Sequence, residues 1–408
     1  GGAATTNSFP SATISNVEVF DIKNLDVTSG TALTIDFGTI SGETTVANNL
    51  SLDDVIFNNL GDGTVAQVIG NGGAANTVAS TFDYADAETS ATIEYKDGVD
   101  SGDLSVTGGK LTSVTIKSSG AQNDIDALTL AGSVTSTTID ASSTFNTSGT
   151  LDLGVSTKLT ITGTASVDLD AATLDTTIDV VDASGSSGAI AVSTGSVSEN
   201  TAATGATITD VVDITVTTGS GADTVTLAND SGLEVSVSTG AGNDTVRIDR
   251  ALVAATSTKV ADVIDGGAGT DILSMTTAAI NGHAEVTTIT NFEELTINTA
   301  ENANDVVLSN IQASGFNTVN AVVGVTTNSD ITFTTGSVGT LNLQDQTDGH
   351  HTVQMGGSGT SDSVSIVNED SAANVFNGKN ITATGIETLT INTTGSGAAT
   401  AQTTGTIG

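Results

Sequence analysis

The amino-acid sequence predicts an all-β protein built from many short strands. Segments in which apolar and polar residues alternate recur along the chain and are bounded by Gly, Ser, Asn and Asp, as expected for strands with one buried face. Thr and Val, which favour pleated and half-buried surfaces, are abundant, whereas helix formers such as Lys, Glu, Arg and Met are scarce. The clearest alternating segments are 111–117, 159–162, 211–217, 233–237 and 389–392.

The composition describes a folded, strongly acidic chain. Its 408 residues include 9 Lys+Arg and 47 Asp+Glu, which gives a formal net charge of −38. With 37% hydrophobic residues and a mean hydropathy of +0.13, the chain can bury a core and is not expected to be disordered. The charge excludes nucleic acid and anionic membrane surfaces as partners, and it favours Ca²⁺. No segment approaches the roughly 20 apolar residues of a membrane span, so no membrane insertion is expected.

One segment recurs along the chain and predicts a repeat architecture. Residues 13–22, 288–297 and 382–391 share a turn residue, an apolar residue, a Glu and an alternating strand. Two degenerate copies begin at Leu111 and Val211. The wide spacing between copies fits several coils of an elongated parallel β-solenoid or β-roll, and it also fits tandem β-sandwich domains, one for each copy. The solenoid is the preferred prediction.

The order of these features divides the chain into three predicted regions. Residues 1–200 form a Thr- and Ser-rich β-repeat region, 201–275 a segment rich in Gly-Asp turns, and 276–408 a second β-repeat region. Long helical periodicity is almost absent. Only 51–57 and 122–128 have the spacing of one or two helical turns.

Gly-Asp turns form the strongest chemical signal. Glycines at alternate positions allow backbone conformations closed to other residues, so that successive carbonyls can turn toward one point, and the following Asp adds a carboxylate. Hard oxygen ligands of this kind select Ca²⁺. The candidate metal-binding residues are Gly219, Gly221 and Asp223; Gly240, Gly242, Asn243 and Asp244; Asp265, Gly267, Gly269 and Asp271; and, in a looser copy, Gly357, Gly359 and Asp362.

These turns resemble the nonapeptide G-G-x-G-x-D-x-U-x of the repeats-in-toxin family. The resemblance implies a parallel β-roll with Ca²⁺ between adjacent turns. In the family each repeat directly follows the one before it, whereas Asp223, Asp244 and Asp271 are separated by more than twice the length of one repeat. Turns that share an ion are therefore expected to require that the residues between them loop out. The alternative interpretation is a set of Gly-Asp hairpin turns without metal.

The chain as a whole resembles calcium-dependent bacterial surface-layer proteins of the repeats-in-toxin type. The shared features are the acidic charge, the absence of Cys, the scarcity of Lys and aromatic residues, and the segment Asn-Phe-Glu-Glu-Leu-Thr-Ile at 291–297. The resemblance implies type I secretion and self-assembly into a calcium-stabilised lattice on the cell surface, with cell-surface polysaccharide as a further candidate partner. A secreted adhesin or matrix filament, or a β-helix polysaccharide lyase, are the alternatives.

Residues suited to catalysis are few, and the protein is predicted not to be an enzyme. The three histidines are His283, His350 and His351, and the sequence has no Cys, no Trp and only two Tyr. It lacks a G-x-S-x-G elbow, an H-E-x-x-H motif and a phosphate-binding lysine loop. A lyase would need a basic residue near its acidic groups, but the only arginines, Arg247 and Arg250, lie in the Gly-Asp segment.

Overall fold

A computed structural model describes most of the chain from residue 14 to residue 299 and shorter pieces beyond it. The described residues are 7–8, 14–25, 32–71, 78–100, 102–195, 212–227, 229, 233–254, 260–283, 288–299, 306–307, 311, 316–322, 329–333, 338–343, 351–355, 362–368, 381–384 and 386–393.

The protein is all-β, and its parallel strands stack into a β-solenoid. The chain forms two compact units. The first consists of Gly1–Ser198 and Ile214–Gly221, and the second consists of Glu199–Asp213 and Ala222–Gly408. In each unit the chain winds in coils, and strands of successive coils pair side by side in parallel sheets. The solenoid prediction is therefore confirmed, and the tandem β-sandwich alternative is wrong. None of the described helices has the length and hydropathy required to span a bilayer.

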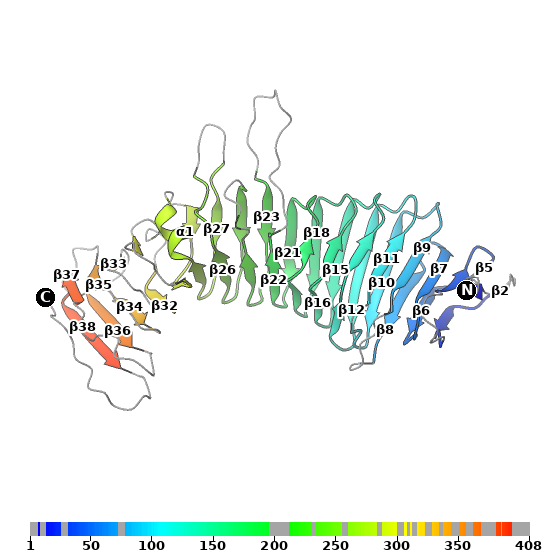
Figure 1. Ribbon diagram of the computed structural model, residues 1–408, viewed down its shortest axis with the longest axis horizontal. Coiled ribbons are helices and arrows are strands. Elements are labelled where there is room, and N and C mark those ends of the chain that lie inside the picture. The colour runs from blue at the N-terminus through cyan, green and yellow to red at the C-terminus, as the bar shows by residue number, and fades with distance from the viewer. Residues whose placement is uncertain are drawn as a thin grey trace, which may run out of the picture. The chain divides into compact units, whose positions relative to one another are not determined.

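The first unit carries three parallel sheets (Figure 1). The first consists of β1 (Asn7–Ser8), β4 (Leu33–Asp36), β7 (Val55–Leu60), β9 (Ser80–Tyr84), β11 (Leu104–Thr107), β14 (Leu128–Leu130), β17 (Thr150–Asp152) and β20 (Thr173–Leu174). The second consists of β3 (Val19–Ile22), β6 (Thr45–Asn49), β8 (Val65–Ile69), β10 (Ser90–Lys96), β12 (Ser113–Ser119), β15 (Ser136–Ala141), β18 (Lys158–Gly163), β21 (Val180–Ser186) and β23 (Ile214–Thr217). The third consists of β13 (Asn123–Ile125), β16 (Phe145–Thr147), β19 (Val167–Leu169) and β22 (Ile190–Ser193), and β2 (Ile14–Ser15) pairs separately with β5 (Ile40–Ser41).

The core of the first unit consists of columns of like residues on successive coils. Ile93, Ile116, Ile139 and Ile161 are register partners, and each is at most 1% exposed. Phe57 and Phe82 are also register partners, and their rings stack with centroids 5.1 Å apart. The alternation seen in the sequence therefore places one side chain of each pair inside the coil, where it packs on the equivalent side chain of the next coil.

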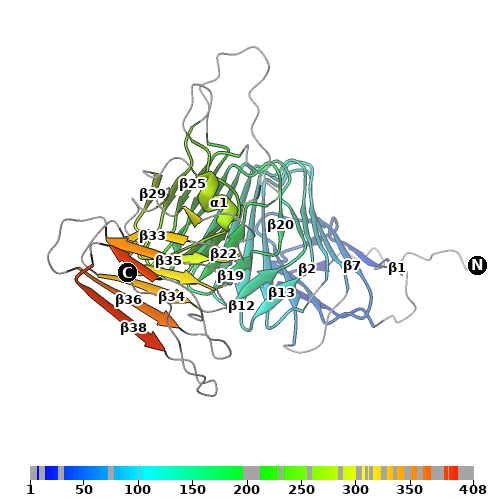
Figure 2. The same cartoon turned by 60° about the vertical axis from the view of Figure 1, so that its left-hand side comes forward.

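The second unit is also built from stacked parallel strands, and Figure 2 brings its last strands, from β33 (Ser329–Phe333) to β38 (Thr388–Thr393), toward the viewer. One sheet contains β25 (Val235–Ser238), β27 (Val263–Asp265) and β29 (Ile289–Thr290), and a smaller one contains β31 (Val306–Val307), β33 (Ser329–Phe333), β35 (His351–Met355) and β37 (Ile381–Thr384). The longest contains β24 (Thr224–Thr226), β26 (Thr245–Ile248), β28 (Ile272–Met275), β30 (Glu294–Ile297), β32 (Thr318–Ala321), β34 (Val338–Leu343), β36 (Ser363–Asn368) and β38 (Thr388–Thr393). The one helix among the described residues is α1 (Thr277–Gly282).

The recurring segment predicted from the sequence is a corner of the coil. Asn16 and Asn291 adopt the left-handed conformation, with φ of 60° and 57°, and let the chain turn into β3 and β30. Leu295 and Ile297 then lie on the buried face, as the alternation predicts. Strands β10, β12 and β15 are neighbours in one sheet and belong to successive coils, so one coil is much shorter than the spacing between copies of this segment. Each interval between copies therefore spans several coils.

The two short helical turns expected from the sequence are wrong. Residues 51–57 lead into strand β7, and 122–128 contain strand β13. Asn123 decides the second case: its buried amide oxygen accepts the backbone N–H groups of Gly98 and Val99 from the preceding coil. Tertiary hydrogen bonds thus override the local spacing.

A column of buried acids as a candidate metal site

Four acidic residues of the second unit lie in register at one corner of successive coils. Asp223, Asp244, Asp271 and Glu293 each directly precede a strand of the longest sheet, namely β24, β26, β28 and β30. The strands pair Thr224 with Thr245, Thr245 with Ile272, and Ile272 with Glu294, so the acids that precede them are aligned as well. We call these four residues the acidic column.

A chain of hydrogen bonds links the acidic column. The backbone N–H of Asp223 donates to Asp244 Oδ1 at 2.8 Å, and the N–H of Asp244 donates to Asp271 Oδ1 at 2.8 Å. The N–H of Asp271 donates to Glu293 Oε2 at 2.9 Å. The carboxylates of Asp244, Asp271 and Glu293 thus each accept one backbone N–H of the preceding coil, through one of their two oxygens.

The remaining oxygens of two of these carboxylates are buried. Asp244 and Asp271 are fully buried, and their Oδ2 atoms accept no hydrogen bond. The hydroxyl of Thr239 is close to Asp244, but it donates to the carbonyl oxygen of Gly266 at 2.7 Å. Burial of a carboxylate oxygen without a partner is costly, and it favours either protonation or a bound cation.

The pKa values of Asp244 and Asp271 also reflect the free-energy cost of burying a carboxylate. Burial raises the pKa of Asp244 to about 6, and the neighbouring charges of Asp223 and Asp271 also raise it, whereas the Asp223 N–H and the nearby Thr239 hydroxyl lower it. Burial also raises the pKa of Asp271, and the charges of Glu293 and Asp265 contribute. Metal-binding carboxylates must be ionised, so a cation at this corner would bind in competition with protons.

The expectation that residues between the Gly-Asp turns loop out is wrong. The interval from each of these Asp residues to the next corresponds to one complete coil, because Thr224 pairs with Thr245 and Thr245 with Ile272. The intervening residues form the other side of the coil, including β25 and β27. The turns therefore stack directly on one another.

The glycines of these turns permit close stacking of the coils. A Cβ on Gly267 would lie 2.0 Å from the carbonyl oxygen of Gly240, and one on Gly269 would lie 1.5 Å from that of Gly242. The Gly240 carbonyl also accepts the N–H of Ala268 at 2.8 Å, so it takes part in the ladder between coils.

Two predicted ligands of the first unit have the same close packing. A Cβ on Gly219 would lie 1.9 Å from the carbonyl oxygen of Ser186, and one on Gly221 would lie 2.4 Å from that of Gly188. The close packing of the coils therefore explains why both positions are occupied by Gly, without a metal ion.

Two other predicted ligands lie at the edge of the turns. Asp265 Oδ1 accepts the Gly267 N–H at 3.1 Å and the Asn291 amide at 2.7 Å. Asn243 Oδ1 accepts the Thr270 N–H at 3.0 Å. These side chains fix the shape of the turn.

The looser Gly-Asp copy is described only in part, because Gly357 and Gly359 lie outside the described residues. Asp362 is 4% exposed and directly precedes β36. Its N–H donates to Glu387 Oε2 at 2.8 Å, and Glu387 directly precedes β38. The arrangement repeats that of Asp271 and Glu293.

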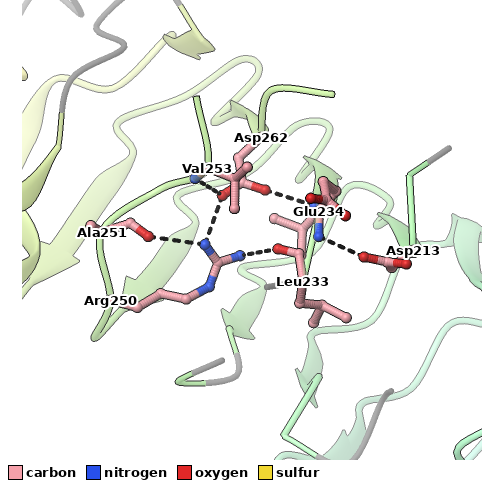
Figure 3. A network of polar contacts seen from close by, with 8 residues as sticks. Asp213, Leu233, Glu234, Arg250, Ala251, Val253 and Asp262 are labelled. Atoms are coloured by element: carbon pink, nitrogen blue, oxygen red, sulfur yellow. Dashed lines mark hydrogen bonds and ion pairs between the residues drawn. The ribbon is translucent and has the colours of Figure 1, made fainter. Parts of the chain in front are cut away.

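At a second acidic corner of the second unit, the buried carboxylate is paired with an arginine side chain (Figure 3). Asp262 is fully buried, and its Oδ2 accepts Arg250 Nη1 at 2.7 Å in one of the two ion pairs of the described residues. Arg250 Nη2 donates to the Leu233 carbonyl at 2.8 Å. Asp262 Oδ1 accepts the Val235 N–H at 2.8 Å. The other ion pair, Lys158 with Asp182, belongs to the first unit.

Sequence reasoning missed Glu293, Glu387 and the Arg250–Asp262 pair. One signal could have found the acids, because each of them stands immediately before an alternating strand. Asp262 before β27 and Glu387 before β38 both follow this rule. The Glu-containing segment and the Gly-Asp turns look unrelated in the sequence, although they occupy the same corner of the coil.

The described side chains alone do not form a complete coordination shell for a metal ion. Among the residues that the structure describes, no three Asp, Glu, His or Cys side chains converge in an arrangement that could hold a metal ion. Ca²⁺ takes six to eight oxygen ligands and commonly includes carbonyls and waters. The unpartnered Oδ2 atoms of Asp244 and Asp271 fit such a role, with the remaining ligands supplied by backbone and solvent.

The first unit contains a separate acidic cavity of about 350 Å³. Its lining combines carboxylates with amide and hydroxyl groups: Asp100, Asp124, Asp126, Asp168, Asn146, Thr147 and Ser148, with Ile125 and Ala171. Asp124, Asn146 and Asp168 are register partners on successive coils, and Asn146 Nδ2 donates to Asp124 Oδ1 at 2.6 Å.

Neither of the two described histidines lines this cavity or belongs to the acidic column. His283 is buried at the end of α1, and His351 begins strand β35. His350 lies outside the described residues.

No protein-family model, curated protein or solved structure matches the chain. Function is therefore inferred from the residues and their geometry.

Proposed function

We propose that the protein is a calcium-stabilised structural protein that assembles with copies of itself into a lattice on the outside of a bacterial cell. The observation that carries the proposal is the acidic column, where Asp244 and Asp271 are fully buried and each keeps one oxygen without a hydrogen-bond partner. A divalent cation would stabilise both carboxylates and bridge consecutive coils.

The contrast between the two acidic corners supports a bound cation. At one corner the carboxylate of Asp262 is neutralised by Arg250. Asp244 and Asp271 of the acidic column take part in neither ion pair of the described residues, although burial raises the pKa of both carboxylates. Hard oxygen donors favour Ca²⁺ over transition metals.

The net charge supports calcium-dependent assembly. At −38, copies of the chain repel one another unless cations neutralise or bridge them. Stacked coils also present the same groups at regular spacing, which suits a repeating contact. Assembly on a cell surface follows from the resemblance to calcium-dependent surface-layer proteins.

The test is electron microscopy and light scattering of the purified full chain during a calcium titration. We expect ordered sheets in millimolar Ca²⁺ that dissociate on addition of a chelator. A protein that stays monomeric throughout the titration would contradict the lattice role.

The acidic cavity of the first unit favours a second candidate, a secreted adhesin that binds a surface polysaccharide. Its carboxylate, amide and hydroxyl groups are suited to sugar hydroxyls, directly or through a cation. In the microscopy experiment, dispersed rods that bind a polysaccharide array would support this candidate. Cleavage of an acidic polysaccharide would instead support a lyase.

A further inference from the structure

We propose that Glu293 and Glu387 complete two equivalent divalent-cation sites, each with the Asp one coil earlier. The inference rests on the proposed calcium function and extends it from the Gly-Asp turns to the recurring segment 288–297 and its copy 382–391. The recurring segment is then the second half of a metal site as well as a corner of the coil.

The same three hydrogen bonds define both pairs. The N–H of Asp271 donates to Glu293 Oε2 at 2.9 Å, and the Asp271 carbonyl accepts the N–H groups of Glu293 and Glu294 at 3.2 and 3.0 Å. In the second pair, the N–H of Asp362 donates to Glu387 Oε2 at 2.8 Å. The Asp362 carbonyl accepts the N–H groups of Glu387 and Thr388, both at 3.0 Å.

An unpartnered oxygen points to a ligand at the first pair. Asp271 is fully buried, and its Oδ2 has no hydrogen-bond partner, although Oδ1 accepts the Asp244 N–H. Glu293 Oε2 accepts the backbone N–H of the same Asp271, which brings the two acidic residues together at one corner of adjacent coils. Two carboxylates held this close on adjacent coils repel each other unless a cation lies between them.

The longer side chain of Glu suits the position after the last Gly-Asp turn. Between Asp223, Asp244 and Asp271 the short Asp side chain reaches the preceding coil, because the glycines bring the coils close together at the corner. Glu293 follows a left-handed Asn291 instead of a Gly-x-Gly turn. One more methylene lets its carboxylate reach the same N–H position.

The sequence provides matched controls. Glu294 is the adjacent residue, and its Oε2 accepts the Asn320 amide at 3.1 Å, away from the column. Glu18 occupies the place of Glu293 in the copy at 13–22, but Glu18 is exposed, whereas the Asp271 beside Glu293 is fully buried. Neither residue should contribute to a cation site.

The experiment is calorimetric titration of the full chain with Ca²⁺ for the wild type and for Glu293→Gln, Glu387→Gln, Glu294→Gln and Glu18→Gln. Gln keeps an oxygen that can accept the Asp N–H, and circular dichroism checks that each variant is folded. We expect Glu293→Gln and Glu387→Gln each to weaken a different site by about 10- to 100-fold, the range seen for supporting residues of metal sites. The two controls should match the wild type.

The outcomes separate this inference from the proposed function. If the wild type binds Ca²⁺ and Glu293→Gln and Glu387→Gln behave as Glu294→Gln does, the inference is overturned and the calcium function stands. If the folded wild type binds no Ca²⁺, the proposed function fails and the inference fails with it.

Discussion

Asp244 is the residue at which the cost of a buried charge is clearest. Its side chain is fully buried, one oxygen has no partner, and burial raises its pKa to about 6. Asn has the same shape and can still accept the Asp223 N–H, but it carries no charge. The effect of Asp244→Asn should therefore depend on whether calcium is present.

For Asp244→Asn we expect a stabilising effect without calcium that becomes smaller or is reversed when calcium is present. Without calcium at pH 7, the variant should be more stable than the wild type by about 1–3 kcal/mol, because about 1.4 kcal/mol corresponds to each unit of pKa shift. With calcium, the variant should be stabilised less by the ion than the wild type is. One bound ion stabilises the folded state by about 2.7 kcal/mol at a hundredfold excess over Kd. Denaturant unfolding in chelator and in Ca²⁺ measures both. Equal stability of the two proteins under both conditions would contradict the prediction.

The pKa of Asp182 is lowered, in contrast to that of Asp244, and it gives a prediction for stability at low pH. The hydrogen bond from Lys158 at 2.7 Å, aided by Ser184, lowers the pKa of Asp182 to about 2. The folded pKa is below the ordinary value of 3.8, so the pair stabilises the fold above about pH 4, and this contribution is lost as the pH falls toward 2. Since both side chains are partly exposed, it should be below about 1 kcal/mol.

The measurement is an NMR titration of the Asp182 carboxyl in the wild type and in Lys158→Met. The variant should raise the pKa of Asp182 toward its ordinary value. The difference in unfolding free energy between the two proteins should shrink between pH 4 and pH 2. An unchanged Asp182 pKa would show that the Lys158 contact does not persist in solution.

Among the structural elements, the Gly-Asp corner is the one most sensitive to side-chain volume. A Cβ on Gly269 would lie 1.5 Å from the Gly242 carbonyl oxygen, and Gly269 has a φ of 154°. We expect Gly269→Ala to destabilise the second unit by about 2–4 kcal/mol, since the coils must move apart at this corner. Gly132→Ala is the control, because a Cβ there would meet no atom within 4 Å.

Thermal unfolding of both glycine variants, with calcium present, provides the test. Gly132→Ala should stay within about 0.5 kcal/mol of the wild type, as surface substitutions usually do. If Gly269→Ala lowers the stability as little as Gly132→Ala does, the coils are not in close contact at the Gly-Asp corner. Loss of calcium affinity in Gly269→Ala is a further expected result, because the acidic column depends on the same stacking.

For the whole molecule, we expect calcium and salt to act differently on stability. A chelator should lower the melting temperature, and hydrogen exchange should increase first around 218–273, where most of the acidic column lies. High monovalent salt should restore only part of the loss, because it screens repulsion among the 47 acidic residues without occupying a site. Mg²⁺ should substitute poorly, since it requires a compact octahedral shell. Full recovery by salt alone would mean that general screening explains the effect.

Much of the fold was determined by the sequence itself. Alternating segments with few helix formers predict short strands with one buried face, and a repeated segment predicts stacked coils. The columns of Ile93, Ile116, Ile139 and Ile161 confirm both expectations. The Gly-Asp turns were also recognisable, because glycine in strained turns followed by Asp is a local pattern.

Only the tertiary structure decided which distant residues share a corner. The register between coils aligns Asp244 with Asp271 and Glu293, although a whole coil of sequence separates each of them from the next. It also pairs Arg250 with Asp262 and turns 122–128 into a strand through Asn123. The physical reason is that a solenoid brings residues together at intervals of one coil. Coil length varies with the turns between strands, and hydrogen bonds between coils outweigh local propensity in fixing it.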